Sequence, residues 1–203
     1  MFKHSVSKHS TPKRIALFSA AAFGALALTA ALTPVTAEDK MMKSELSGEK
    51  TVMVGGAAMF PSKNIIQNAV NSKDHTTLVA AVKAAGLVDT LEGKGPFTVF
   101  APTNAAFGKL PAGTVDTLVK PENKATLTKI LTYHVVPGKL EASSLTNGKK
   151  LKTVEGEELT VKLADGKVWI VDAKGGSSAV TIANVNQSNG VIHVVDTVLM
   201  PAS

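Results

Sequence analysis

The sequence predicts one α+β domain, in which helices come first and a mostly antiparallel set of strands follows. Three observations support this class. Apolar residues recur at helical spacing up to about residue 134, they alternate with polar residues beyond Leu140, and residues 97–107 join an apolar strand directly to a capped helix. Such a corner fixes two layers against each other, which suits a structural centre better than a catalytic loop.

The N-terminus has the pattern of a secretory signal peptide: basic residues, an apolar run over 15–32, and small residues ending at Ala37. The basic residues are Lys3, Lys8, Lys13 and Arg14. We predict residues 1–37 to be a signal peptide cleaved after Ala37, which places the protein in the periplasm or outside the cell without stable membrane insertion. The alternative is a retained single-span anchor, because the apolar run is near the lower limit for crossing a bilayer.

Charge and cysteine content exclude several classes of function. The chain carries 22 basic and 16 acidic residues, and four of the basic ones precede Ala37, so 18 basic and 16 acidic residues remain after it. Arg14 is the only arginine, and the lysines are interspersed with acids. This pattern does not predict nucleic-acid binding. The absence of cysteine excludes disulfides and thiol catalysis.

Residues 38–60 are predicted to form a flexible, methionine-containing segment ahead of a domain over 61–203. Four of the six methionines lie here: Met41, Met42, Met53 and Met59. Thioethers are soft ligands for Cu(I), so one alternative is a periplasmic metal or redox-stress protein. The other is a tail whose apolar residues, 52–60, pack on the domain.

Helices are predicted over the first half of the domain. Apolar spacing and capping residues indicate a short helix at 64–70, a longer one at 74–85 that ends at Gly86, a turn of helix at 87–91, and a helix from Pro121 to about His134.

The central corner begins with a β-prone strand, Phe97 to Phe100, which Pro102 closes. Thr103 or Asn104 then caps a helix with a side-chain oxygen. Phe107 lies one turn further along and is expected to face the core.

Strands dominate the C-terminal third. Residues 159–163 and 168–171 flank the hairpin turn Asp165-Gly166, and the segments 180–185 and 191–199 follow. Residues 191–195 are apolar at nearly every position, which predicts a strand buried on both faces. His193 is therefore expected to be a buried neutral imidazole bonded across the sheet, and Asp196 to accept hydrogen bonds from backbone or a threonine hydroxyl.

Three further arrangements contain residue types that occur in functional sites. A metal site requires His75, His134 and His193 to converge, although no two have the spacing of a local pair. A serine hydrolase reading of Gly175 to Ala179 requires a strand before it and a helix after it, whereas a strand follows. Tyr133 and His134 form either a partner-contact patch or a structural pair in which His134 donates to a backbone carbonyl and Tyr133 packs.

Two segments, Thr98 to Phe107 and Asn189 to Pro201, closely resemble the signature blocks of the fasciclin domain family, and Tyr133-His134 falls where the family has its Tyr-His motif. The resemblance covers about residues 64–201. The chain looks like a bacterial member of the family with a single domain. It implies a fasciclin fold, a two-sheet β-wedge with helices packed along one side, in which the two blocks form adjacent central strands. It also implies an exported or cell-surface protein of an adhesion-related family without an established catalytic centre.

The sequence as a whole therefore predicts a non-catalytic exported binding or adhesion module without a cofactor. Its expected partners are a cell-surface or matrix protein or a polysaccharide, contacted through loops and the edge at Tyr133 and His134. The alternatives are the methionine-based metal protein and an uncharacterised hydrolase, which requires a deep polar pocket around His134 or His193. The motif residues expected to serve the architecture are Phe100, Pro102, Thr103, Asn104, Phe107, His193 and Asp196.

Overall fold

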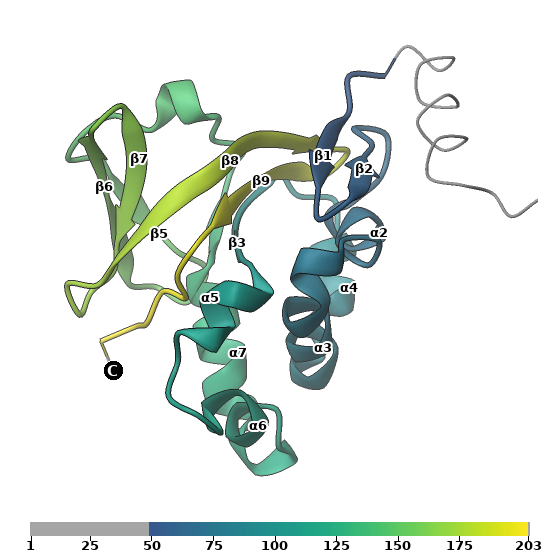
Figure 1. The fold of residues 1–203 in the computed structure, drawn as a ribbon, viewed down its shortest axis with the longest axis vertical. Helices are drawn as coiled ribbons and strands as arrows, with labels where there is room; N and C mark the ends of the chain where they lie inside the picture. Colours follow the sequence, from purple (N-terminus) through teal and green to yellow (C-terminus); the bar gives the residue numbers. More distant parts are fainter. Residues whose placement is uncertain (1–48, 203) are drawn as a thin grey trace, which may run out of the picture. The chain divides into compact units, whose positions relative to one another are not determined.

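A computed structural model of the chain describes residues 49–202 (Figure 1). The predicted signal peptide, its cleavage site and Met41 and Met42 lie outside these residues. Within the described part, no helix combines the length and the apolar character that crossing a bilayer requires.

Six short α-helices belong to this part: α2 (Ile65–Ala69), α3 (Thr76–Ala85), α4 (Val88–Glu92), α5 (Asn104–Gly108), α6 (Thr114–Leu118) and α7 (Lys124–Tyr133). Three single turns of 3-10 helix accompany them: η1 (Lys73–His75), η2 (Pro121–Asn123) and η3 (Ala142–Ser144). These positions confirm the predicted helices, and Gly86 ends α3 in the left-handed conformation, with φ of 73°.

The strands are β1 (Val52–Val54), β2 (Ala57–Met59), β3 (Phe97–Pro102), β4 (Val135–Pro137), β5 (Lys150–Lys152), β6 (Glu158–Ala164), β7 (Lys167–Val171), β8 (Ser177–Gln187) and β9 (Gly190–Val195). Seven of them pair in the order β4-β3-β9-β8-β7-β6-β5, while β1 and β2 form a separate hairpin. The β3–β9 pair is parallel and its neighbours are antiparallel. The two signature segments are thus adjacent strands at the centre of the sheet, as expected.

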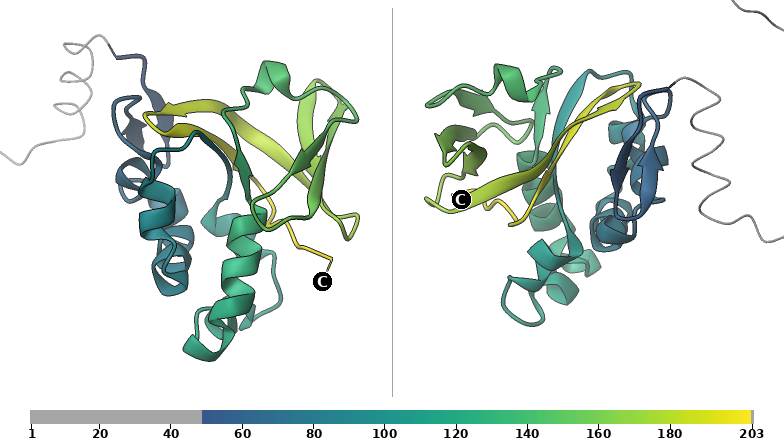
Figure 2. Two further views of the ribbon diagram at one scale, coloured as in Figure 1. Left: turned by 180° about the vertical axis from the view of Figure 1, so that it is seen from behind. Right: turned by 45° about the horizontal axis from the view of Figure 1, so that its top comes forward.

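Strand β8 belongs to two sheets at once. Its first residues pair with β7 and its later residues pair with β9, and the register shifts twice between Val180 and Val185. Such bulges bend a strand and increase its twist. The bend turns β5, β6 and β7 back toward β4 (Figure 2), and the Val154 N–H donates to the Val135 carbonyl at 2.8 Å beyond the end of β5.

The helices pack along one side of the central strands (Figure 1). Two apolar cores result. The face of β3 and β9 that carries Val99 and Ile192 packs against the helices. The opposite face, with Phe100 and Val195, packs between the two sheets against Leu159 and other strand residues. This double coverage explains why every residue of β9 is buried and confirms the predicted fold class.

The ordered domain begins before the predicted boundary at residue 61. Residues 52–59 form the β1–β2 hairpin, in which Val54 and Met59 are buried in the core. The methionine-containing segment is therefore not a flexible tail over this part, because its apolar residues alternate with the period of a strand and cover the helical core.

Candidate functional site

Tyr133 and His134 lie where α7 ends and β4 begins, and both are buried. Neither side chain is exposed, which corrects the expectation that Tyr133 and His134 form an edge for contact with a partner. The apolar neighbours that bring the helix into the core also bring these two rings inside. The geometry instead matches the alternative in which both serve the fold.

The His134 ring joins two distant backbone segments. Its Nδ1 donates to the Ile130 carbonyl at 2.8 Å, and its Nε2 accepts from the Leu199 N–H at 3.0 Å. One donor and one acceptor require a neutral ring. Burial lowers the pKa of His134 to about 4, against the smaller opposing effects of the Ile130 carbonyl and Asp172.

The Tyr133 hydroxyl crosses to the strands of the second sheet. It accepts from the Ala173 N–H at 2.9 Å and donates to the Glu158 carbonyl at 3.3 Å. Burial raises the pKa of Tyr133, so the phenol stays protonated and keeps both roles.

His193 occupies the space between the two sheets, as a buried neutral imidazole. Its ring stacks on Phe100 with centroids 5.7 Å apart, Nε2 donates to the Leu140 carbonyl at 2.8 Å, and Nδ1 accepts from the Asn184 N–H at 3.4 Å. Burial lowers the pKa of His193. The ring holds the β4–β5 connection against β9.

Asp196 follows β9 and accepts hydrogen bonds, as the sequence predicts. Its Oδ1 receives the Ala179 N–H at 2.9 Å and the Thr197 hydroxyl at 3.0 Å. Burial acts to raise the pKa of this carboxyl, but these hydrogen bonds and the positive charge of Lys109 together lower it. Asp196 therefore fixes the crossing of β8 and the C-terminal segment.

The remaining motif residues build the corner after β3. Phe100 and Phe107 are buried, and Pro102 ends β3 opposite Val195. Thr103 is the residue that caps α5, since its hydroxyl accepts from the Ala106 N–H at 3.2 Å. The Asn104 side-chain oxygen accepts instead from the Thr77 N–H at 3.0 Å, and this hydrogen bond connects α5 to the start of α3.

Within the described residues, the side chains of the alternative hydrolase and histidine-metal sites do not come together. Within residues 49–202, no group of histidine and acidic side chains has the arrangement of a metal site. The hydrolase reading fails because His134 and His193 are buried and both nitrogens of each ring contact backbone groups. Residues 175–179 enter strand β8 directly, with no helix after them.

The two described methionines of the segment, Met53 and Met59, do not have the arrangement of a copper site. Met53 and Met59 lie on opposite strands of the hairpin but not in register with each other. Met59 is 3% exposed within the core, whereas Met53 is 43% exposed. They face different environments, so they do not converge as a pair of thioether ligands.

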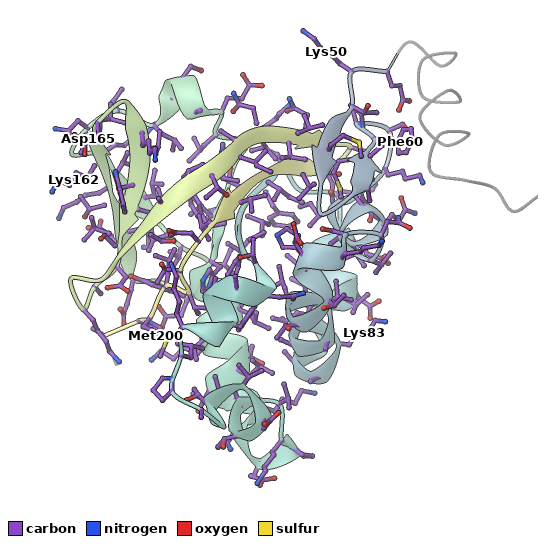
Figure 3. All side chains as sticks on the ribbon, viewed as in Figure 1. Lys50, Phe60, Lys83, Lys162, Asp165 and Met200 are labelled. Atoms are coloured by element: carbon purple, nitrogen blue, oxygen red, sulfur yellow. The ribbon has the colours of Figure 1, made fainter. Side chains whose placement is uncertain are left out.

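Sequence reasoning missed an open hollow on the outer face of β6, β7 and β8. It has a volume of about 490 Å³ and surrounds Trp169, with Lys162, Asp165 and Ser177 at its rim. Figure 3 shows Lys162 and Asp165 together where the β6–β7 hairpin meets solvent. The available signal was the single tryptophan of the chain, placed in a strand opposite Lys162.

Fold and side chains together define an α+β domain in which the buried motif residues hold the strands and helices together. The sequence model of the fasciclin domain matches residues 73–201, and this chain belongs to the fasciclin family. The expected resemblance is thereby confirmed.

Two relatives with curated descriptions are similar to this chain over most of its length. Protein sll1483 of Synechocystis sp. is 52% identical over 153 residues, which cover 75% of this chain and 82% of that protein. Cell surface glycolipoprotein MPB83 of Mycobacterium bovis is 39% identical over 153 residues, covering 73% of this chain and 64% of that protein. Neither of these two names describes an enzyme.

A solved structure shares the fold. The FAS1 domain pair of the insect cell adhesion molecule Fasciclin I matches with a TM-score of 0.62 at 19% identity. The match covers 70% of this chain and 52% of that chain, so this chain spans about half of the two-domain structure.

Proposed function

We propose that this protein is a non-catalytic, exported binding module that contacts a polysaccharide of the cell surface or matrix. The observation that carries the proposal is the open hollow around Trp169. Family membership and the cell-surface name of MPB83 support an adhesion-related role outside the cytoplasm.

The hollow has the chemistry of a saccharide site. Trp169 is half-buried and presents an aromatic side chain of the kind that packs well against other flat, partly apolar rings. Lys162 and Ser177 supply hydrogen-bond donors and Asp165 supplies an acceptor, all on exposed side chains. Ala164 and Gly175 are small and leave the ring accessible.

The single tryptophan makes the test direct, because every change in indole fluorescence reports on this hollow. Soluble fragments of peptidoglycan, chitin and cellulose are titrated into the protein, and retention on the insoluble polymers is measured in parallel. At least one of them is expected to shift the emission and retain the protein. Trp169→Ala is expected to weaken retention at least about tenfold, a typical loss for a central aromatic contact.

Leu163→Ala is the matched control, because Leu163 is 47% exposed on the neighbouring strand and does not line the hollow. It is expected to retain wild-type binding. Equal retention of wild type and Trp169→Ala refutes the hollow as the site. Binding to a purified surface protein, without retention on any of the three polysaccharides, refutes a polysaccharide as the partner.

A further inference from the structure

The sheet of β5, β6 and β7 has one face inside the molecule and one face outside. Leu159, Val161 and Ile170 are fully buried between the two sheets. Side chains alternate along a strand, so the neighbouring Lys162 and Trp169 point away from this core. These two residues are directly opposite each other in the pairing of β6 with β7. The ring at the centre of the hollow therefore has a lysine as its cross-strand neighbour.

The outer face of this sheet carries more positive than negative charge. Its charged side chains, assigned by the register of the strands or by their place in the hollow, are Lys150, Lys152, Glu158, Lys162, Asp165 and Lys167. All of them are exposed. Lys150 and Glu158 form an ion pair of 3.2 Å. Within residues 49–202, the other three lysines and Asp165 take part in no ion pair, which leaves three unpaired positive charges against one negative charge.

Lys162 and Lys167 approach Trp169 from two sides. Lys162 is the opposite residue on β6, and such pairs have Cβ atoms about 4.5–5.5 Å apart. Lys167 precedes Trp169 by two residues on β7, which is a rise of about 7 Å along the same face. Two positive charges thus flank the aromatic ring. A sugar ring that stacks on the indole would hold an acidic substituent within reach of either ammonium group.

This arrangement favours an anionic ligand over a neutral one. Unpaired like charges repel each other, and a negative charge placed between them relieves the repulsion. An ammonium group is a point charge on a flexible stem, so it can meet carboxylates at irregular positions along a polymer. A neutral saccharide would use the ring of Trp169 and leave the lysines around it without partners.

We propose that the polysaccharide bound at this face is acidic, with one sugar ring on Trp169 and carboxylates of the same polymer against Lys162 and Lys167. The inference rests on the proposed function and narrows its substrate class. Lys152 extends the positive surface onto β5, so a polymer that crosses the strands meets a further ammonium group. Of peptidoglycan, chitin and cellulose, only peptidoglycan carries carboxylates, so it is the expected ligand among those three.

Polygalacturonate and alginate, each compared with its own neutral ester, test the charge of the ligand. Indole fluorescence and retention on immobilised polymer measure binding at about 50 mM salt, where screening is weak. At least one acidic polymer is expected to bind at least about fivefold more tightly than its ester, as two exposed ion pairs allow. Equal affinities within both pairs overturn the proposal. Tighter binding of single-stranded DNA than of either acidic polymer overturns the saccharide.

The double variant Lys162→Gln with Lys167→Gln removes both charges beside the ring. It is expected to lose the preference for the acidic polymer, while its affinity for the ester stays that of the wild type. The charge-retaining variant Lys162→Arg with Lys167→Arg is expected to keep the preference.

Lys83→Gln with Lys94→Gln is the matched control, because it removes the same charge from two other exposed positions. Figure 3 shows Lys83 on the helices, away from Lys162, and Lys94 follows α4. This control is expected to bind as the wild type does. Equal losses in the two glutamine variants overturn the assignment to the outer face.

Trp169→Ala separates a failure of this inference from a failure of the proposed function. It is expected to weaken binding of an acidic polymer and of its ester alike, whereas the lysine substitutions affect the acidic polymer alone. Retention on chitin, cellulose or a neutral ester, without any preference for acidic polymers, leaves the proposed function standing and overturns the acidic ligand. Absence of binding to every polysaccharide refutes both.

Discussion

His134 Nε2 accepts a hydrogen bond from the backbone N–H of Leu199, 65 residues further along the chain. The same ring donates from Nδ1 to Ile130 in the last turn of α7, so it ties the helix to the segment that follows β9. Both contacts need one protonated and one unprotonated nitrogen. The family's Tyr-His motif is in this chain a neutral link between a helix and the C-terminal end of the domain.

The stability of the domain is expected to fall as the pH is lowered from about 6.5 to 4. Burial holds the pKa of His134 near 4, below its ordinary 6.5, so the unfolded chain binds more protons in this range. His134 alone accounts for up to about 3 kcal/mol of unfolding free energy, which is fully present above pH 6.5 and is lost by pH 4.

Urea unfolding at several pH values measures this slope. In His134→Gln the slope is expected to be smaller but not zero, because burial also lowers the pKa of His75 and His193. An identical slope in both proteins contradicts the role given to His134.

Tyr133→Phe is expected to lower the free energy of unfolding by about 1–2 kcal/mol, because the Ala173 N–H and the Glu158 carbonyl each lose a buried partner. Thr132→Val on the same helix is the control, since the Thr132 hydroxyl bonds only to helix carbonyls one turn back. It is expected to change the unfolding free energy by less than about 0.5 kcal/mol. Chemical denaturation compares the two, and equal losses count against the hydroxyl as a link between sheets.

Gly190→Ala is expected to lower the free energy of unfolding by at least about 2 kcal/mol, because a Cβ at this position would overlap the carbonyl of Phe97 in the paired strand β3. The backbone of β3 at Phe97 cannot move away from the added Cβ as a flexible side chain could. Gly108→Ala, at the end of α5, meets nothing and is expected to be neutral or slightly stabilising. Thermal unfolding of both variants tests the contrast, which disappears if the two central strands are not in contact.

Met59→Ala is expected to lower the free energy of unfolding by about 2–4 kcal/mol, and Met53→Ala by less than about 0.5 kcal/mol. Met59 is 3% exposed and Met53 is 43% exposed, although both lie in the same hairpin. Denaturation by urea is the measurement. Similar small effects would show that the hairpin is not part of the folded core.

The sequence predicted the fold through features that act locally or repeat. Gly86, Thr103 and the Asp165-Gly166 turn each need only their neighbours to act, and the nearly continuous run of apolar residues along 191–195 reflects burial on both faces. The resemblance supplied the pairing of distant strands, which no local pattern contains.

The candidate site was less accessible to such reasoning. Exposure of Tyr133 depends on β6 and β7 folding over it, a contact between segments about 25–40 residues apart. Exposure of His134 depends on the segment after β9, 65 residues further along the chain. The hollow at Trp169 likewise arises from side chains on several elements. Asn189, whose amide bonds the Leu91 carbonyl at 2.7 Å and the Ile65 N–H at 3.1 Å, is a further link that composition does not reveal.

The parallel pairing of β3 with β9 also bears on how the polypeptide acquires its shape during synthesis. Strand β9 is the last strand along the described residues, yet it pairs with β3 and contributes to both cores. The centre of the sheet cannot close before β9 has been synthesised, since contacts between remote segments form late and slowly. A nascent chain that ends before β9 is therefore an open substrate for chaperones and for any machinery that requires an unfolded polypeptide.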